Sequence, residues 1–492
     1  MYGMKRKGDT MKPIWQMFSG VILLTLLAGC AAFQPTDPYA AGAGAGITTR
    51  LPSVSADAQP AQAEASEPLS GPIDLSEAIA IALKRNPDIG ASGYDIAAAQ
   101  ARKDQARSAM LPDISAIGGY NRFLDDQRLI PARYNGEPGA YSTSIFAGDI
   151  VLRMPLYTGG RRINEIRAAT LLEEASRHRL GRNREEIVFN VSSVFYAILA
   201  QQKVIDSLLF AEKALSSHLK RINDLIAAQK AAKVDRLRTE VRLADVRQKI
   251  VREKNTLAVQ KQLLVNFMGV GQTHQDIELQ GALDADAAPT LTLEDSISAA
   301  YQKRPDYLAV RKELEAQGRR VDVARGEHLP TVSLFGTYGG RWAVNPSDQP
   351  GGPDAPSASS TEDVGSIGIG LEIPIFEGGR IQARVAEERA KLAAAQERMR
   401  KLELQIRLEV ESALLNFASA GERVRTLRKS VEQADESLRI ERQKYEVGKG
   451  AIVDVLDAQS ALLESETNYY GALADVLTAR AQIDLATGEE KP

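Results

Sequence analysis

The sequence predicts a mainly α-helical protein that also contributes strands to a membrane β-barrel. Three features favour this fold class: an internal repeat, long stretches in which apolar residues recur every three or four positions, and shorter segments in which apolar and polar residues alternate. Of the 492 residues, 44% are hydrophobic but only 5% are aromatic, which is typical of long helices rather than of a compact α/β enzyme. The 61 basic and 64 acidic residues are interspersed, so no nucleic-acid partner is expected.

Residues 1–29 have the pattern of a signal peptide. Basic residues at 5–7 precede the mostly apolar stretch Ile14–Leu27, the order that marks a secretion signal. The stretch ends in Leu27-Ala28-Gly29-Cys30, which is similar to a lipobox, the site where bacteria attach lipid to a cysteine. Because Cys30 is the only cysteine and can form no internal disulfide, we interpret it as a lipidation site that carries fatty acids such as palmitate. The alternative is a plain signal peptide followed by an unrelated cysteine.

Residues 30–71 are expected to form a lipidated, flexible tether. Ala, Gly, Pro, Ser and Thr dominate this stretch, which leaves too little apolar surface to fold alone. Ala31 follows the cysteine; an Asp there would indicate retention in the inner membrane, so lipoprotein sorting rules favour anchoring in the outer membrane.

The mature chain repeats itself at an offset of 218 or 219 positions. Such self-similarity indicates two copies of one structural unit, which we place at 72–290 and 291–490. The matching landmarks are Asn86-Pro87-Asp88 with Arg304-Pro305-Asp306, Leu111-Pro112 with Leu329-Pro330, Met154-Pro155 with Ile373-Pro374, Gly159-Gly160-Arg161 with Gly378-Gly379-Arg380, and Val234-Asp235 with Val453-Asp454.

Each copy contains two segments of strand character, at about 112–123 and 144–157 in the first and about 330–342 and 364–377 in the second. In the last of them Ile367, Ile369 and Leu371 alternate with Ser366 and two glycines. Strict period two with one apolar face predicts a half-buried strand, and each segment is long enough to cross a bilayer. The glycines, Gly368 and Gly370, suggest an open bore on the polar face.

After each Gly-Gly-Arg landmark the period becomes helical. Apolar residues then step by three and four, the spacing of supercoiled helices, as in Leu392, Ala395, Met399 and Leu402. A helix over 380–446 would be about 100 Å long, and a return helix after a turn near Gln229 or Gly448 completes a hairpin in each copy. The mature chain has no run of about 18 apolar residues, so no transmembrane helix is expected.

Four strands cannot close a barrel, and open strand edges are not tolerated in lipid. Single-chain barrels start at about eight strands. The chain is therefore expected to pool its strands with further copies of itself.

The segment that begins at Tyr445 and ends at Gln459, with Gly448, Asp454 and Asp457 inside it, resembles the periplasmic tip of TolC-like outer membrane efflux proteins. The repeat order resembles that family over nearly all of the mature chain. The resemblance implies a homotrimer with a twelve-strand barrel in outer-membrane lipid and a twelve-helix tunnel in the periplasm. It also implies a passive channel, neither an enzyme nor a cofactor protein, that works with a periplasmic adaptor (membrane fusion protein) and an inner-membrane pump.

The same resemblance assigns residues at the tip. Asp454 and Asp457 match an acidic ring at the narrow end of the tunnel, and Tyr445 matches a tyrosine of the constriction. The family's best-known member has an arginine five residues after that tyrosine; this chain has Gly450, which cannot form the same link. The expected adaptor-docking tip comprises Gly448, Val453, Leu456 and Asp235. Taken alone, each tip aspartate would be an ordinary surface charge or a helix cap.

Neither a catalytic nor a metal-binding constellation stands out. The four histidines are far apart in sequence without a ligand pair at i, i+4, and His178 and His218 lie in polar helical stretches where solvation is expected. A lipid-anchored hydrolase is the rival enzyme reading, but it lacks a nucleophile elbow. Two transport readings stay open. The lipid anchor favours a small-molecule efflux channel, because lipidated members resemble partners of proton-driven pumps. The alternative is the outer-membrane outlet of a type I polypeptide secretion system.

Overall fold

The computed structural model describes residues 71–132, 139–229, 232–270, 277–284, 292–344, 347–349 and 361–489. The chain divides into two compact units, Met1–Leu69 and Ser70–Pro492, and every described residue belongs to the second. The expected signal peptide, the lipidation site Cys30 and all but the last residue of the tether lie outside the described residues.

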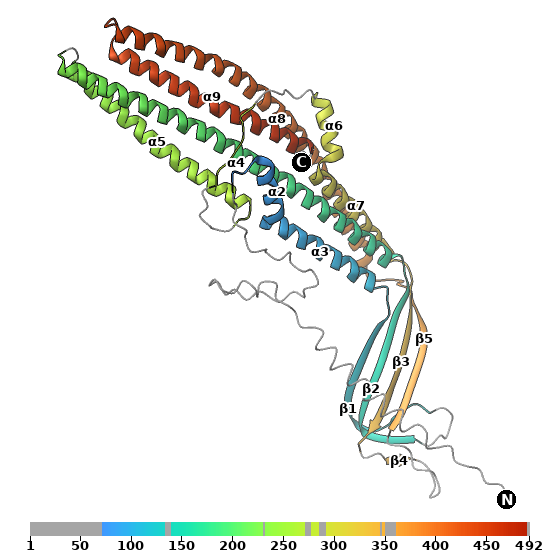
Figure 1. Ribbon diagram of the computed structural model, residues 1–492. Helices are drawn as coiled ribbons and strands as arrows, with labels where there is room; N and C mark the ends of the chain where they lie inside the picture. Colours follow the sequence, from blue (N-terminus) through green and yellow to red (C-terminus); the bar gives the residue numbers. More distant parts are fainter. Residues whose placement is uncertain are drawn as a thin grey trace, which may run out of the picture. The chain divides into compact units, whose positions relative to one another are not determined.

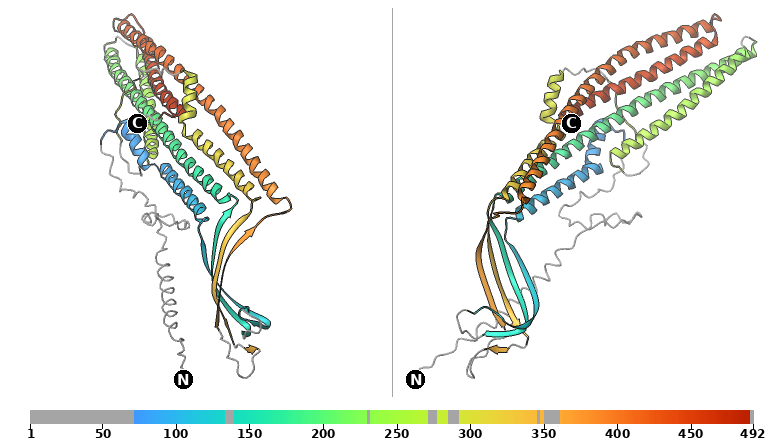
Figure 2. Two further views of the ribbon diagram at one scale, coloured as in Figure 1. Left: turned by 90° about the vertical axis from the view of Figure 1, so that its right-hand side faces the viewer. Right: turned by 180° about the vertical axis from the view of Figure 1, so that it is seen from behind.

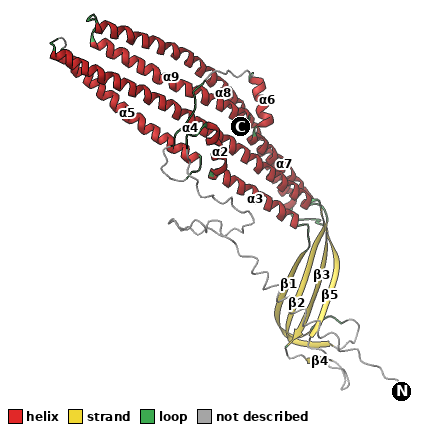
Figure 3. Ribbon diagram, in the orientation of Figure 1, coloured by secondary structure: helices red, strands yellow, loops and turns green. Residues whose placement is uncertain are grey.

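Helices dominate the described unit, and the strands form one sheet (Figures 1 and 3). The order helix, helix, two strands, long helix, helix occurs over 75–267 and again over 293–487, where a short extra strand is added. The elements are α2 (Leu75–Arg85), α3 (Pro87–Ser108), β1 (Asp113–Arg128), β2 (Gly139–Thr158), α4 (Arg161–Ala227), α5 (Lys233–Phe267), α6 (Leu293–Lys303), α7 (Pro305–Gly326), β3 (Thr331–Ala343), β4 (Ser347–Gln349), β5 (Thr361–Glu372), α8 (Arg380–Glu446) and α9 (Ile452–Thr487).

Local sequence explains where the helices begin. Pro87 and Pro305 are the first residues of α3 and α7, where the missing N–H costs nothing and the fixed φ suits a helix. Gly160 and Gly379 precede the two 67-residue helices α4 and α8 with φ of 77° and 84°. These are left-handed values that glycine adopts without strain, so each Gly-Gly-Arg landmark turns a strand directly into a long helix.

The sheet is antiparallel with the order β1-β2-β3-β5, and β4 pairs with the start of β2. Its register aligns residues of like character. Leu152 lies opposite Ile114 on one side and Gly336 on the other, and Gly336 lies opposite Ile367. Because side chains alternate between faces, this register gathers most of the large apolar side chains on one face. Ile367 is 78% exposed there.

Aromatic side chains mark both ends of the apolar face. Phe146 stacks on Trp342 with ring centroids 5.4 Å apart, and Tyr120 lies 4.7 Å from Phe146 on the other side. Tyr157 lies at the end next to the helices, after a bulge that follows Pro155. Strands rising about 3.3 Å per residue and tilted by about 40° would place these two levels about 25 Å apart, the height of the apolar band of outer-membrane barrels.

The opposite face is mainly polar, but it is not bare. Arg341 of β3 forms an ion pair with Asp149 of β2 at 2.7 Å, and Thr337 shares a 2.8 Å hydrogen bond with Ser366. A Cβ added to Gly368 would lie 2.6 Å from the ring of Phe335. Gly368 therefore accommodates an aromatic ring within the sheet, while an open bore stays a prediction about the assembled barrel.

The fourth strand is shorter than the sequence suggests. β5 ends at Glu372, whereas the alternating pattern continues to about residue 377. Pro374 interrupts it, because proline has no N–H to donate to a ladder. The following Ile375 and Phe376 are 94% and 87% exposed, so this apolar stretch leads from the sheet to α8 without pairing.

The helices form a layer whose order follows that of the sheet (Figure 2). α4 packs against α3 and α7 in the half next to the sheet, and against α5 and α9 in the other half. α8 packs against α7 and then α9. The order is thus α3–α4–α7–α8 near the sheet and α5–α4–α9–α8 towards the hairpin turns, with α3, α5 and α8 at the edges.

α4 contains an 18-residue window apolar enough to cross a membrane by composition, with a mean hydropathy of 1.3. Sequence reading gave no such run, because scattered polar residues interrupt it. In the structure 44% of the window is buried. Gly281 lies against Leu199 and Phe195 of α4, so part of this apolar surface is covered by the segment 277–284.

The two sheet faces should respond differently to a charge. Ile369→Arg would place a guanidinium on the apolar face, which costs about 2–4 kcal/mol per chain near the middle of a bilayer. We expect this variant to lose assembled protein in outer-membrane fractions. Ser366→Arg, on the polar face, loses one hydrogen bond and should assemble nearly normally. Greater damage from Ser366→Arg would show that the faces are inverted.

Candidate functional site

The ends of the two helical hairpins lie side by side (Figure 1), and buried side chains from both form one apolar cluster. Each of the four long helices contributes to it, so burial of these side chains couples one hairpin to the other. The buried members are Val204, Leu208, Ala211, Leu215, Ile222, Leu243, Val246, Ile250, Leu438, Ile452, Val455, Leu456 and Ala458. We call this set the tip cluster.

The two hairpin turns differ in the residue that reverses the chain. Gly448 has φ of 76°, which glycine adopts freely, whereas Gln229 holds φ of 59° at the other turn. A side chain in this left-handed region is strained. Gly450 is constrained by space, because an added Cβ would lie 3.0 Å from the Cβ of Lys444. A side chain at position 450 would require this neighbour to move by a few tenths of an ångström.

The tip aspartates cap helices and remain accessible. Asp235 accepts a hydrogen bond from the backbone N–H of Ala232 at 3.4 Å, and Asp454 accepts one from Ala451 at 3.3 Å. Each therefore satisfies a donor that would otherwise be unpaired at a helix start. Asp454 and Asp457 are both exposed, so their side chains can face solvent.

Only some of the residues expected to dock the adaptor are accessible in the structure. Gly448 is exposed, and Val453 and Asp235 are half-buried. Leu456 is only 7% exposed and belongs to the tip cluster. Its inclusion in a docking surface is therefore corrected: its side chain holds the hairpins together and offers a partner almost no area.

Tyr445 lies between the two hairpins, half-buried beside the tip cluster. Burial and the nearby carboxylate of Asp235 raise the pKa of its phenol, so it remains a neutral donor. Its ring lies 5.2 Å from that of His218 on α4. The expectation that His218 is solvated is wrong, because this ring is half-buried and its Nε2 has no hydrogen-bond partner among the described residues.

A salt bridge joins the hairpins next to Tyr445. Arg221 of α4 contacts Glu446 of α8 at 3.1 Å, with both side chains about half exposed. An exposed pair of this kind contributes at most about 1 kcal/mol. Sequence reasoning missed both partners, because they lie 225 positions apart without a shared motif.

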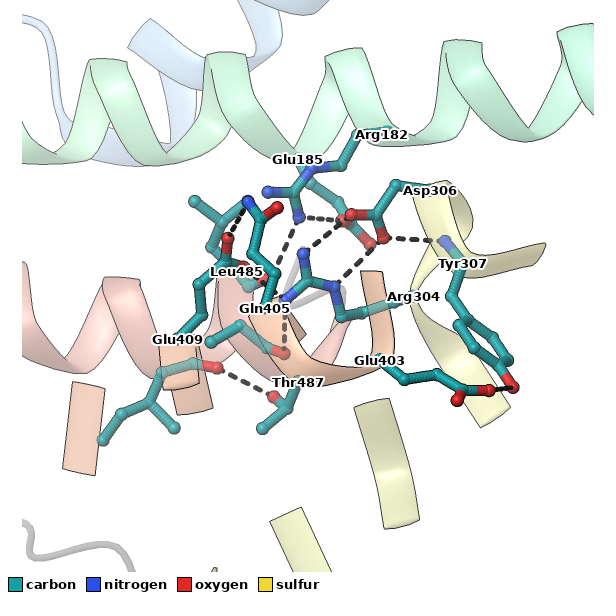
Figure 4. Close-up of polar contacts among 12 residues, drawn as sticks. Arg182, Glu185, Arg304, Asp306, Tyr307, Glu403, Gln405, Glu409, Leu485 and Thr487 are labelled. Atoms are coloured by element: carbon teal, nitrogen blue, oxygen red, sulfur yellow. Dashed lines mark hydrogen bonds and ion pairs between the residues drawn. The ribbon is translucent and has the colours of Figure 1, made fainter. Parts of the chain in front are cut away.

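A second polar cluster lies where the hairpins meet the shorter helices (Figure 4). Arg304, only 1% exposed in its side chain, pairs with both oxygens of Asp306 at 3.0 and 2.7 Å and with Glu409 at 2.7 Å. It also donates to the carbonyl of Ala486 at 3.3 Å. One guanidinium thus ties the start of α7 to α8 and to the end of α9.

The corresponding landmark of the first copy uses a neutral side chain. Asn86 donates to the carbonyl of Phe267 at the end of α5 at 2.8 Å and accepts from the N–H of Asp88. Gly269 and Gly488 then pack against Arg85 and Arg304, each closer than a Cβ would allow. Both repeat landmarks therefore fasten the junction of the two short helices to the end of the return helix.

Glu185 of α4 faces this cluster and is 9% exposed. Burial raises its pKa to about 7, although Arg182 and Arg304 act against the shift. Arg182 lies 3.4 Å from it and donates to the carbonyl of Leu485. A proton can therefore bind inside the helical layer near neutral pH.

The described residues contain no group of three or more His, Cys, Asp or Glu that could hold a metal ion. Cys30 and His274 lie outside the described residues. The tip thus combines exposed carboxylates with a phenol and an imidazole that lie in contact between the hairpins.

Comparison with known proteins relates this architecture to membrane channels. The sequence model of the family described as "Outer membrane efflux protein" matches residues 78–270 and 296–489. The chain is 23% identical to the cobalt-zinc-cadmium resistance protein CzcC of Cupriavidus metallidurans, covering 85% of this chain and 91% of that one. It is also 23% identical to the proteases secretion protein PrtF of Dickeya chrysanthemi, over 78% and 81%. A membrane protein from Pseudomonas aeruginosa has a similar fold, with a TM-score of 0.71 at 22% identity, over 84% of this chain and 92% of that one.

Glu185 should make the stability of the helical layer depend on pH. Its pKa is higher in the folded chain than the ordinary 4.5, so its contribution is present at low pH and lost as pH rises through about 7. We expect the midpoint temperature of thermal unfolding to decrease as pH is raised from about 5 to about 8. Glu185→Gln should remove much of that decrease. The exposed neighbour variant Glu186→Gln is the control and should behave like the wild type. An unchanged pH profile in Glu185→Gln would contradict the assignment.

Proposed function

The chain belongs to the outer membrane efflux protein family, and on that premise we propose that three copies form the outer-membrane channel of a tripartite efflux system. The observation that carries the proposal is that the sheet and the helical layer both end in open edges. Within the described residues β1 and β5 are each paired on one side only. Such edges require closure in lipid, and three chains of four long strands would supply a twelve-strand barrel.

Exposed apolar rows at the edges of the helical layer support the same closure. Val241 and Val259 of α5 are 71% and 60% exposed, and they lie on the side of α5 away from α4. Leu408 and Leu415 of α8 are each 64% exposed, on the side away from the core. Rows of this kind at both edges suit packing of α8 against α3 and α5 of a neighbouring copy.

In the proposed barrel the apolar sheet face contacts lipid, and the aromatic residues at its two ends lie at the membrane interfaces. The polar face, with the Asp149–Arg341 pair, then lines the pore. Lipid on Cys30 would anchor each protomer to the same membrane.

The tip provides the gate of the proposed channel. Three copies would gather about six carboxylates, from Asp454 and Asp457, around one axis, and crowded charges of one sign attract counter-ions. Tyr445 holds the shut tip from between the hairpins. The exposed turn at Gly448, with Val453 and Asp235, is the surface that we assign to the periplasmic adaptor, while an inner-membrane pump supplies the energy.

The second candidate is the outlet of a type I polypeptide secretion system. The name of the PrtF relative favours it, whereas the name of the CzcC relative favours export of small cargo. We favour small molecules as the cargo, because the lipobox-like motif at Cys30 is typical of the lipidated efflux channels of this family. Identifying the pump encoded beside this protein would decide between the two.

The oligomer can be tested at the helical edges. Leu415→Lys and Val259→Lys each introduce a charge into an apolar row at opposite edges, so we expect loss of the trimer in mass measurements of detergent-solubilised protein. Phe210→Lys is the matched control, because Phe210 is 72% exposed but lies on the central helix α4. If all three variants assemble equally, or if the wild type is a folded monomer, the proposed closure of the barrel by three copies is wrong.

The acidic ring can be tested by ion block. We expect the channel in planar bilayers to prefer cations and to be plugged by multivalent cations from the periplasmic side. Asp454→Ala with Asp457→Ala should weaken block strongly while the trimer persists, although loss of the Asp454 cap costs about 1 kcal/mol of helix stability. The control is Asp435→Ala, which removes an exposed acidic residue of α8 that lies further from the turn. Unchanged block in the double variant would show that these aspartates do not line the pore.

A further inference from the structure

We propose that His218 positions Tyr445 in the shut tip and that protonation of its imidazole loosens the two hairpins as pH falls. The inference rests on the proposed gate at the tip. It assigns a pH response to one residue of α4 that the tip motif does not contain.

The geometry makes His218 part of the contact between the hairpins. It lies on α4 between Leu215 and Ile222, which are 1% and 0% exposed members of the tip cluster. Its ring meets that of Tyr445 on α8 at 5.2 Å with an interplanar angle of 59°. The neutral imidazole thus fills the space beside the phenol, and one of its nitrogens, Nε2, is buried without a hydrogen-bond partner among the described residues.

The charges around this ring oppose a further positive charge. Burial is the main cause that lowers the pKa of His218, followed by Arg221 on its own helix and Arg442 on α8. Glu446 of α8 acts in the opposite direction but already pairs with Arg221. The carboxylate of Asp235, on α5, helps to raise the pKa of the Tyr445 phenol.

The sign of the pH effect follows from this lowered pKa. The pKa of His218 is depressed in the packed tip, so the neutral imidazole stabilises that packing at pH values above its ordinary pKa of about 6.5. This contribution is lost as the pH falls through the depressed pKa. A protonated His218 gains by moving into water, away from Arg221 and Arg442. Acid should therefore shift the tip from the packed to the loosened arrangement.

One interaction would act in the opposite direction. An imidazolium held over the ring of Tyr445 would gain a cation–π attraction, which would tighten the tip in acid. The observed tilt and the two neighbouring arginines argue against this outcome, and the direction of the pH response distinguishes the two.

The experiment measures conductance of the full-length protein in planar bilayers at about pH 7.5 and about pH 5.5, a range in which histidine titrates. Wild type should conduct several-fold more at the lower pH. His218→Phe keeps a ring beside Tyr445 but cannot bind a proton, so it should stay at low conductance at both pH values. His218→Gln loses the ring and should be leaky at both.

Two matched variants exclude other titrating groups. His178→Gln removes another histidine of α4, which lies near Lys312 and Arg311 far from the tip. Glu185→Gln removes the carboxyl whose pKa is about 7. Both should keep the wild-type response, and mass measurement should show the same oligomer for every variant.

The proposal is overturned if His218→Phe responds to acid like the wild type, if acid lowers the wild-type conductance, or if the response disappears in Glu185→Gln instead. Failure of the proposed function is distinguishable, because then no variant conducts at either pH, and this inference would fail with it.

Discussion

The open edges of the sheet impose the strongest constraint on this fold. Each backbone N–H and C=O needs a partner, and hydrocarbon supplies none. The outer sides of β1 and β5 are unpaired in the described part of the chain, so a membrane position for this sheet requires strands from other copies. The helical layer also has open edges, because α3, α5 and α8 lie at its sides and no further helix within the described part of the chain covers them. One cyclic arrangement of three chains would satisfy both.

Within one chain, α4 holds the layer together at two levels. Towards the turns the contact is apolar, through the tip cluster. Near the shorter helices the contact is polar: Arg182 of α4 donates to the carbonyl of Leu485 on α9, beside the buried Arg304, which joins α7 to α8 and α9. Breaking a buried ion pair costs several times more than breaking an exposed one. The junction around Arg304 is therefore suited to act as a fixed point, while the half-exposed Arg221–Glu446 pair at the tip can open at low cost.

How far the sequence predicts this structure depends on the range of the interaction. The period of apolar residues and the Gly-Gly-Arg landmarks are local, and they placed the long helices and the strand alternation. The end of β5 was missed, because alternation continues through Pro374, which cannot join a ladder. Leu456 was misassigned for a different reason: its burial depends on α4 and α5, about 200 positions earlier. His218 was judged by its polar neighbours in sequence, whereas its environment is set by Tyr445 and Arg442 of the other hairpin.

Asp454 caps a helix and is also a member of the proposed acidic ring, and these two roles are physically compatible. One oxygen accepts the N–H of Ala451, so the charge lies at the start of α9, where the helix dipole favours an anion by about 0.3–1 kcal/mol. Like charges gathered at one axis, as in the proposed ring, repel each other. Capping offsets part of that repulsion while the side chain remains exposed. Asp235 has the same position at the start of α5, so each hairpin turn presents an acidic group that caps its own helix.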